Sequence, residues 1–449
     1  MANDPVAYLF GLEQFGIKFG LENIRAILDA LGHPERSFPA IHVAGTNGKG
    51  SVTALVDSAV RAAGYRCGRY TSPHLVELTE RFVVDGRPAS DDALREATAT
   101  VHAAILALLG QGTLRAHPTF FEATTAVAFE LFRRASVDVA VCEVGLGGRL
   151  DATNVLAPVV TAIVSIGLDH EQHLGGSIAA IAAEKAGIIK PGVPVVVGDL
   201  DQESDAVISQ VARRLGAHVV RARSLASVES VQTDADGSQT FRLRTASTDY
   251  GRVTLRLSGA HQVDNARVAI GVLEALASVG FPVSPAAVAH GFATVHWPGR
   301  LQQIAFDDGR ELLLDAAHNP DGARTLAAFL ARRERCPLVF GAMKDKNVGA
   351  ILDVLASSVS AIVATRAPTP RAADPHWLAD VARQSAPDVP VQVVDAPMDA
   401  LTAAWKLSQR IVVAGSIFLL GDVLKVFGTM DPSTRLFPDR SPRLGVDRS

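Results

Sequence analysis

Short runs of apolar, β-branched residues alternate with longer Ala- and Leu-rich stretches along most of the 449-residue chain. Strands of a parallel sheet buried on both faces give such short runs, and the helices between them give the longer stretches. The pattern therefore predicts an α/β protein built from βαβ units. The expected strands are Ala40–Ala44, Val137–Glu143, Val159–Ser165 and Val193–Val197, and the expected helices are Val52–Ala63, Asp91–Leu109, Phe121–Arg134 and Ser177–Gly187.

A second series of the same kind begins near residue 300. Its expected strands are Glu311–Asp315, Pro337–Phe340, Ala361–Ala364, Val391–Val394 and Arg410–Ala414, with helical patterns such as Gly322–Arg333 between them. The Pro298-Gly299 pair between the two series is a turn signal, so His296–Arg300 is a candidate hinge. We expect two domains, residues 1–295 and residues 296–449, joined at that point.

Composition excludes several classes of protein. The chain has 43 Lys and Arg residues against 47 Asp and Glu, and this balance lacks the basic excess of a nucleic-acid binder. No basic segment with an apolar core opens the chain, and its richest apolar stretch, Ile411–Leu420, is about half of the ~20 residues that a membrane helix needs. The three cysteines lie far apart and indicate neither a disulfide framework nor a zinc site. We expect a soluble, cytoplasmic protein that binds neither nucleic acid nor membrane.

The strongest local motif is the glycine-rich segment 45–51, GTNGKGS, which follows a predicted strand and opens a predicted helix. Glycines let the backbone approach a phosphate, the helix start offers free N–H groups, and Lys49 adds a positive charge. A glycine-rich turn without a ligand is the alternative. In the common phosphate loop a Ser or Thr follows the lysine and holds Mg²⁺, whereas Gly50 stands here. Other residues must therefore supply the metal ligands.

Three candidate ligands follow predicted strands: Ser72, Glu143 and His170. Ligands bind beyond the carboxyl ends of the strands in open parallel sheets, so these side chains could meet the phosphate loop. Mg²⁺ prefers hard oxygen ligands, which suits Ser72 and Glu143 better than His170. Asp169 competes with its neighbour His170, and a surface histidine is the alternative for the latter.

Three further positions have two possible roles each. Lys185, near the end of a predicted helix, would ordinarily be an exposed helix lysine. Asp151 follows a glycine-rich turn and could either contact a ligand or cap a helix. Asp315 stands between a predicted strand and a predicted helix, where it could serve a nucleotide sugar or a substrate, or simply cap the turn.

Nine motifs, taken together and in this order, resemble the folylpolyglutamate synthase / dihydrofolate synthase family. That family is related to the Mur ligases, which usually place Thr or Ser directly after the loop lysine. The motifs are GTNGKGS, YTSPHL, TFFEATTA, EVGLGGRLDATN, GLDH, EKAGIIKPG, HQVDNA, WPGR and DAAHNP.

The resemblance implies a Mur ligase-like fold, in which a P-loop ATPase-type parallel-sheet domain precedes a smaller, Rossmann-like α/β domain. It also implies ATP-dependent amide formation by an acid–amino-acid ligase. A substrate carboxylate attacks the γ-phosphate of ATP, and the amine of L-glutamate then displaces phosphate from the acyl phosphate. The acceptors would be dihydropteroate and tetrahydrofolate, the second domain would close over the site and contribute to ATP and glutamate binding, and the enzyme would be a monomer.

The resemblance also assigns roles to residues of this chain. Lys49, Lys185 and His170 would be catalytic. Ser72 and Glu143 would hold one Mg²⁺, and His170 with an N6-carboxylated Lys185 would hold a second. The residues implied for ATP are Thr46, Asn47, Gly48, Lys49, Gly50, Ser51, Asn265, Arg300 and Asp315. Those implied for the acyl acceptor are Ile17, Lys18, Phe19, Thr119, Phe120, Phe121, Glu122, Leu150, Asp151 and Ala152.

Four functional readings stay open on the sequence. The form GGRLDATN resembles the bacterial bifunctional enzymes, which make dihydrofolate and also extend folates with glutamate. A synthase restricted to chain extension is the nearest alternative. A Mur-type ligase is more distant, because Gly50 and the early phosphate loop count against it. A non-catalytic nucleotide binder is the last, and the intact Lys49, Glu143 and Lys185 argue against it.

Overall fold

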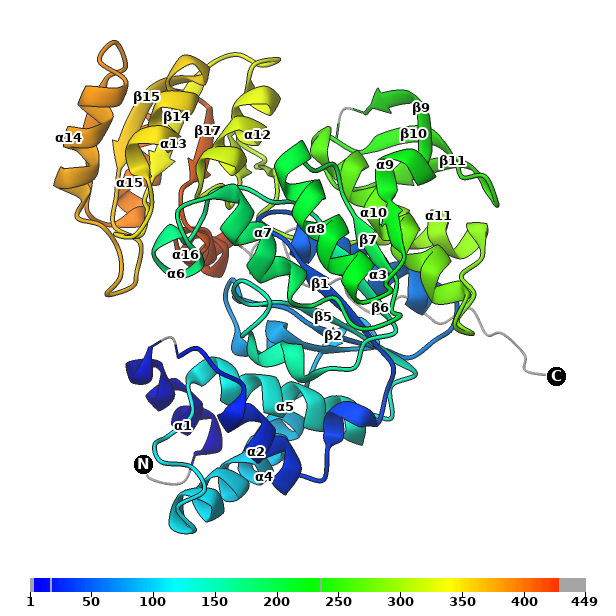
Figure 1. Cartoon of the computed structure of the whole chain (residues 1–449). Helices are drawn as coiled ribbons and strands as arrows, with labels where there is room; N and C mark the ends of the chain where they lie inside the picture. Colours follow the sequence, from blue (N-terminus) through cyan, green and yellow to red (C-terminus); the bar gives the residue numbers. More distant parts are fainter. Residues whose placement is uncertain (1–3, 17, 235, 428–449) are drawn as a thin grey trace.

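A sheet of eight strands, in the order β4-β3-β2-β5-β1-β6-β7-β8, organises the first part of the chain in the computed structural model (Figure 1). The structure describes residues 4–427 apart from residues 17 and 235. Six of the strands run parallel, and β3 and β4 are added antiparallel at one edge. The strands are β1 (Ala40–Ala44), β2 (Cys67–Tyr70), β3 (Phe82–Val84), β4 (Arg87–Pro88), β5 (Val139–Glu143), β6 (Val160–Ile163), β7 (Val195–Val197) and β8 (Val219–Arg221).

Helices cover both faces of this sheet, which is why its strands read as continuous apolar runs. In β1, Ile41 and Val43 join a core with α3, α10 and α11, while Ala40 faces the opposite helices. The helices are α1 (Pro5–Gly11), α2 (Glu22–Ala30), α3 (Lys49–Ala62), α4 (Asp91–Gly110), α5 (Phe120–Arg134), α6 (Glu171–Leu174), α7 (Ile178–Ala186), α8 (Gln202–Arg214), α9 (Ala222–Leu225), α10 (His261–Ala277) and α11 (Pro285–Thr294).

A small antiparallel sheet, absent from the sequence expectations, packs beside α10 and α11 (Figure 1). Its strands are β9 (Ser227–Thr233), β10 (Gln239–Arg244) and β11 (Asp249–Leu255). In β10, buried Phe241 and Leu243 alternate with exposed Arg242 and Arg244. This two-residue period is the signal of a half-buried strand, and the search for long apolar runs missed it.

The last part of the chain forms a separate α/β domain around a six-stranded sheet, ordered β12-β13-β17-β14-β15-β16. Helices α12, α13 and α14 cover one face, and α15 and α16 cover the other. The predicted class, a parallel-sheet domain followed by a smaller α/β domain, is confirmed. The elements are β12 (Gln302–Ala305), β13 (Glu311–Leu314), α12 (Pro320–Leu330), β14 (Cys336–Phe340), α13 (Val348–Leu355), β15 (Val359–Ala364), α14 (Pro375–Ser385), β16 (Val391–Val393), α15 (Pro397–Trp405), β17 (Arg410–Ala414) and α16 (Ile417–Phe427).

The predicted segments all exist, but several of their ends were wrong. Helix α3 begins at Lys49 rather than Val52, because the phosphate loop leads directly into its first turn. Helix α12 begins at Pro320, where Asn319 caps it through a bond from Gly322 N, and ends at Leu330 rather than Arg333. Strand β5 starts two residues later than predicted, at Val139.

Among the described residues, helix α4 is long and apolar enough to cross a membrane by length and composition alone. One face of α4 packs against α1, α2 and α5, and its Leu94, Ala97, Val101 and Ile105 belong to their common core. Contacts of this kind are those of a helix inside a folded domain.

A buried ion-pair network ties α3 to the sheet. Asp57 is completely buried, and its carboxylate accepts hydrogen bonds from Arg61 Nε at 3.2 Å and from Arg69 Nη1 at 3.0 Å. The Arg69 guanidinium also lies 5.3 Å from the ring centre of Trp297, at the junction of the two series of strands. One carboxylate therefore balances two arginines, of which Arg69 is buried and Arg61 is half-buried.

Replacing Asp57 with Ala should destabilise the protein strongly, because it leaves Arg69 buried without its counter-charge. We expect a loss of about 3–5 kcal/mol in the free energy of unfolding, measured as a lower urea midpoint. Asp205→Ala is the matched control: its ion pair with Arg221 spans 2.8 Å at the surface, and its loss should cost less than about 1 kcal/mol. Equal, small effects of the two variants would contradict a structural role for Asp57.

Candidate active site

The predicted phosphate loop connects the end of β1 with the first turn of α3. It is fastened to the loop after β6 by side-chain bonds. The Thr46 hydroxyl donates to Gly167 O at 3.1 Å and accepts from Gly167 N at 3.0 Å, and Asn47 N donates to Ser165 Oγ at 2.9 Å. The backbone of the loop is therefore held in place before any ligand binds.

Gly48 and Lys49 have geometry suited to a phosphate. Gly48 has a φ of 81°, and a Cβ there would lie 2.6 Å from Asn265 Oδ1, so only glycine fits. The Lys49 amine donates to Gly45 O at 3.1 Å and to Thr46 O at 3.2 Å, folding back over its own loop. An anion in the loop would meet this amine and the free N–H groups at the start of α3.

The structure explains why glycine follows the loop lysine. A Cβ at Gly50 would lie 2.4 Å from Cζ2 of Trp297, so the indole occupies the space that a Ser or Thr side chain needs. Ser51, one residue later, is buried and accepts from Gln262 Nε2 at 3.3 Å.

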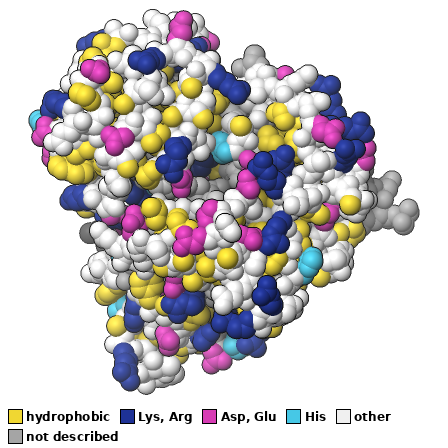
Figure 2. Space-filling view, turned by 45° about the horizontal axis from the view of Figure 1, so that its top comes forward, with side chains coloured by type: hydrophobic (Ala, Val, Ile, Leu, Met, Phe, Trp, Pro, Cys, Tyr) yellow, Lys and Arg dark blue, Asp and Glu magenta, His cyan; other side chains and the backbone are white. Residues whose placement is uncertain are grey.

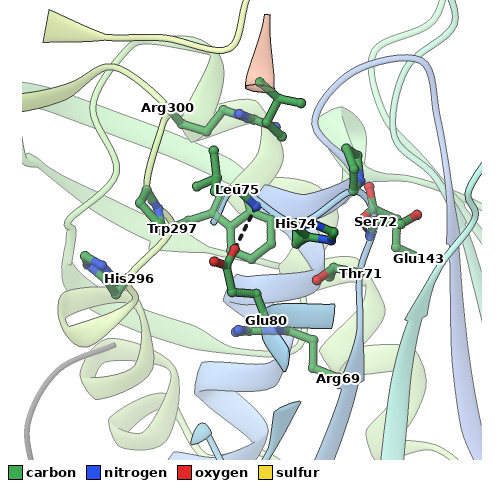
Figure 3. Close-up of a pocket in the computed structure, with 13 residues that line it drawn as sticks. Arg69, Thr71, Ser72, His74, Leu75, Glu80, Glu143, His296, Trp297 and Arg300 are labelled. Carbon is green, nitrogen blue, oxygen red and sulfur yellow. Dashed lines mark hydrogen bonds between the residues drawn. The ribbon is translucent and has the colours of Figure 1, made fainter. Parts of the chain in front are cut away.

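Ser72 and Glu143 lie together at the ends of β2 and β5, as predicted. Ser72 N donates to Glu143 Oε2 at 3.2 Å, and Glu143 is buried. Burial raises the pKa of Glu143, and the charge of nearby Lys49 opposes that rise. Figure 3 shows both side chains in one pocket, which Trp297 and Arg300 reach from the later part of the chain.

His170 lies near the same edge of the sheet, in the loop after β6. Its neighbour Asp169 makes more contacts with charged and polar side chains of the second domain. Asp169 pairs with Lys346 Nζ at 2.6 Å and with His318 Nε2 at 3.4 Å, and accepts from Asn319 Nδ2 at 3.0 Å. Burial, followed by the charge of Lys346, lowers the pKa of His170 to about 4. His170 is thus a neutral imidazole near pH 7, the form that binds metals, whereas Asp169 is occupied by its partners.

Lys185 is buried, so the exposed-lysine interpretation is wrong. It is only 4% exposed, and its amine donates to Gly45 O at 3.0 Å, the same carbonyl that Lys49 contacts. Burial, followed by the charge of Lys49, lowers the pKa of Lys185 to about 7. A buried amine of this kind is partly uncharged at neutral pH and can react as a nucleophile.

The donor set fits magnesium, although no three His, Cys, Asp or Glu side chains gather into a metal site within the described ranges. Ser72 and Glu143 offer the hard oxygens that Mg²⁺ prefers, and phosphate oxygens at the loop can complete such a shell.

A cluster of aromatic side chains stands at the start of α5. The Phe120 ring lies 6.0 Å from that of Phe10, and the Phe121 ring lies 6.1 Å from that of Tyr70. Two phenyl rings can hold a flat heteroaromatic group between apolar surfaces.

Thr119 and Glu122 form a capping box at the start of α5. Glu122 Oε2 accepts from Thr119 N at 2.7 Å, and Glu122 N donates to Thr119 Oγ1 at 3.1 Å. These two residues place the phenyl rings, and the buried Glu122 carboxylate is already occupied.

Asp151 is buried, as is its neighbour Ala152. Asp151 accepts hydrogen bonds from Leu146 N at 2.8 Å and Thr153 N at 3.0 Å, and also from the Thr153 hydroxyl. Asp151 therefore caps the turn, which was one of the two roles that the sequence allowed. Its charge also contributes to the raised pKa of Glu143.

The remaining acceptor candidates are less enclosed. Phe19 is 45% exposed with its ring 6.0 Å from that of His173, Lys18 is exposed, and Leu150 is half-buried. Ile17 lies outside the described residues.

Three predicted ATP contacts come from later in the chain. Asn265 packs on Gly48 and donates to Gln262 Oε1 at 2.9 Å. Arg300 lies within electrostatic reach of Glu143 and Asp315. The Asp315 carboxylate accepts from Leu301 N and Ala317 N, each at 2.9 Å, so it holds the turn that presents Arg300.

On the face drawn in Figure 2 the surface is hollowed near its middle, with acidic and basic side chains around the hollow.

Sequence reasoning missed Lys346, Asn319 and Arg81. Lys346 and Asn319 come from the second domain and contact Asp169, and Asn319 also donates to Asn47 Oδ1 at 3.1 Å. The only signal for Lys346 was a charged loop after a strand. Its partner Asp169 lies 177 positions away, so no local pattern connects the two residues.

Two family models match the chain. The Mur ligase middle domain matches residues 86–273, and the glutamate ligase domain of Mur ligases matches residues 299–417. The dihydrofolate synthase/folylpolyglutamate synthase of Bacillus subtilis is 34% identical over 431 residues, covering 94% of this chain and 98% of its own. The enzyme of the same name from Mycobacterium tuberculosis is 38% identical over 441 residues, covering 91% and 90%.

Solved structures agree with this result. Folylpolyglutamate synthase of Mycobacterium tuberculosis, complexed with ADP and AMPPCP, superimposes with a TM-score of 0.88 at 36% identity over 95% of this chain and 99% of its own. FolC of Escherichia coli, in complex with DHPP and ADP, gives a TM-score of 0.83 at 30% identity, covering 95% and 98%. The chain belongs to the folylpolyglutamate synthase / dihydrofolate synthase family of the Mur ligase superfamily.

Proposed function

We propose that this chain is an ATP-dependent ligase that joins L-glutamate to dihydropteroate, forming dihydrofolate, and to folates, forming polyglutamates. The observation that carries the proposal is the convergence of a phosphate loop, the Ser72–Glu143 pair and an aromatic cluster around Phe121 at one edge of the sheet. Relatives that match over nearly their whole length bear both activities in their names. Neither restriction to chain extension nor a Mur-type reaction is favoured.

ATP is the co-substrate, and the phosphate loop is the place for its phosphates. Thr46 to Ser51 would surround them with backbone N–H groups, and the Lys49 amine would turn from Gly45 O toward the γ-phosphate. Asn265, Arg300 and Asp315 would complete the nucleotide site from the facing side. Arg300 would bind a phosphate group of ATP. The Asp315 carboxylate is engaged by backbone N–H groups of the turn beside Arg300 and does not pair directly with the Arg300 guanidinium.

Ser72 and Glu143 would hold one Mg²⁺, and His170 with a carboxylated Lys185 would hold a second. Bound there, magnesium would neutralise the charge that develops on the transferring phosphoryl group. Carboxylation joins the neutral Lys185 amine to carbon dioxide with release of one proton. It places an anion beside the Lys49 amine in place of a group that is partly cationic at neutral pH, which removes the repulsion between the two amines.

The acyl acceptor would lie with its ring system between Phe120 and Phe121 and its donor groups toward Asp151 and Ala152. Its carboxylate would then point to the phosphate loop, where attack on the γ-phosphate gives the acyl phosphate. Phe19 and Lys18 would flank the entrance together with Leu150, while Thr119 and Glu122 would set the ring positions through the capping box.

The second domain, residues 296–449, would close over this centre and bring L-glutamate to the acyl phosphate. Its Lys346 and Asn319 already contact Asp169, and such closure excludes water that would hydrolyse the intermediate. We propose residues 1–295 as the ATP-binding domain and a cytoplasmic monomer as the working form.

The substrate range can be tested by phosphate release from ATP with Mg²⁺ and L-glutamate, using dihydropteroate and tetrahydrofolate in parallel. We expect release with both acceptors. Lys49→Ala should lower both rates by at least about 100-fold, because the amine meets charge that develops in the transition state.

Release with tetrahydrofolate alone would restrict the enzyme to chain extension. Release with neither acceptor would overturn the proposal, and an undiminished Lys49→Ala variant would remove the phosphate-loop assignment.

Lys185→Ala should lose most activity, because no carboxylate then faces the second metal. Added acetate or propionate should restore part of it, and the intact mass of the wild type should show the added carboxyl group. Lys406→Ala, an exposed lysine at the end of α15, is the control and should stay fully active. A fully active Lys185→Ala variant would contradict the metal role.

A further inference from the structure

Arg81 is a buried arginine close to the centre of the site, in the segment between β2 and β3. It ends the short 3₁₀ helix Leu78–Arg81 and is 8% exposed. Its Nε donates to His74 Nδ1 at 2.9 Å, and the His74 ring lines the pocket of Figure 3. This bond engages only Nε, so the two terminal nitrogens keep their donors for another partner.

Within the part of the chain that the structure describes, no carboxylate comes within 4.0 Å of Arg81, and its side chain makes one hydrogen bond, from Nε to His74. No nitrogen of Arg81 is among the fully buried polar atoms that lack a partner, so its terminal nitrogens remain open to the site. The other buried arginine nearby, Arg69, has Asp57 as its counter-ion at 3.0 Å. Buried arginines are normally paired, because burial disfavours an uncompensated charge. Burial accordingly lowers the pKa of Arg81.

The nearby anionic groups do not supply that partner. Glu80 uses its carboxylate on the backbone N–H groups of Leu75, Val76 and Glu77. Glu143 accepts from Ser72 N, and the Tyr70 hydroxyl bonds to Thr124 and Thr125. Glu13, also within electrostatic reach of Arg81, is exposed.

Arg81 lies between the proposed binding place of the acceptor rings and the proposed metal site. Its guanidinium carbon is 5.1 Å from the ring centre of Phe120, in the proposed ring pocket, and it lies within electrostatic reach of Glu143, at the proposed metal. An acceptor that binds its rings at Phe120 and presents a carboxylate to the phosphate loop must pass this cation. The free donors of Arg81 therefore face the tail of the acceptor.

We propose that Arg81 binds the α-carboxylate of the terminal glutamate of folate substrates and so serves chain extension specifically. This inference rests on the proposed function. Dihydropteroate has one carboxylate, which must react, whereas a folate carries a reacting γ-carboxylate and an α-carboxylate that does not react. A guanidinium paired with the reacting group would make it a poorer nucleophile, and the non-reacting group gains a two-point partner at no such loss.

The test pairs an Arg81→Gln variant with a tetrahydrofolate analogue whose α-carboxylate is replaced by a carboxamide. For the wild type, kcat/KM should fall by roughly 10- to 100-fold from tetrahydrofolate to the amide, the range for a charged hydrogen bond. Arg81→Gln should turn over both at the low rate, within about twofold of each other, and should use dihydropteroate within about threefold of wild type.

Arg81→Lys keeps the charge and should recover part of the discrimination between acid and amide. Arg133→Gln removes a cation on α5 whose partner Glu130 retains Arg134, and it should leave all rates unchanged. Thermal melting of each variant reports folding, and the acid-to-amide ratio within one variant does not depend on how much enzyme is folded.

A full acid-to-amide difference in Arg81→Gln would overturn the inference, as would an equal loss with dihydropteroate and tetrahydrofolate. The latter result would place Arg81 on the reacting carboxylate instead. If the wild type does not use tetrahydrofolate, the proposed function itself fails. The experiment therefore distinguishes failure of the proposed function from failure of the Arg81 inference.

Discussion

Two lysine amines share one carbonyl oxygen at the centre of the molecule. Lys49 and Lys185 both donate to Gly45 O, at 3.1 and 3.0 Å. Two cations held this close, one of them almost completely buried, make the bare site electrostatically unfavourable, and the pKa of Lys185 is lowered accordingly. Anions would relieve the conflict: a phosphate at Lys49 and, as proposed, a carboxyl group on Lys185. A preference of the site for an anionic nucleotide would then follow from this single contact.

The topology of the sheet produces the contact. Strand β1 lies between β5 and β6, and β2 lies beyond β5, so the loops that follow these parallel strands open at one edge. The phosphate loop, Ser72, Glu143 and His170 come from those four loops. The second domain then adds Lys346 and Asn319 from above, both on Asp169. Residues scattered over most of the chain thus reach one point because the strands run in the same direction.

Local patterns predicted the two α/β series, because a strand buried on both faces and a covering helix differ in period and length. The glycine-rich segment predicted the phosphate loop, and the positions of Ser72 and Glu143 at strand ends predicted that they could meet it. Patterns could not predict the burial of Lys185, since its helix is almost uniformly Ala-rich, nor the hydrogen bonds that occupy Glu122 and Asp315. The Asp169–Lys346 pair and the position of Arg81 over the Phe120 ring are contacts between segments that are distant in the chain, which one sequence does not encode locally. Gly50 is the instructive case: its departure from the common loop is visible in the sequence, but its reason, the Trp297 indole, is visible only in three dimensions.

The central claim is that the acceptor carboxylate attacks ATP and becomes an acyl phosphate before glutamate reacts. Dihydropteroate labelled with a heavy oxygen isotope in its carboxylate tests this most directly. During turnover with ATP and L-glutamate, one labelled oxygen should move into the released phosphate, because the bond to the displaced phosphate contains it. Release of phosphate free of label, with the oxygen that leaves the carboxylate appearing in water instead, would contradict the account.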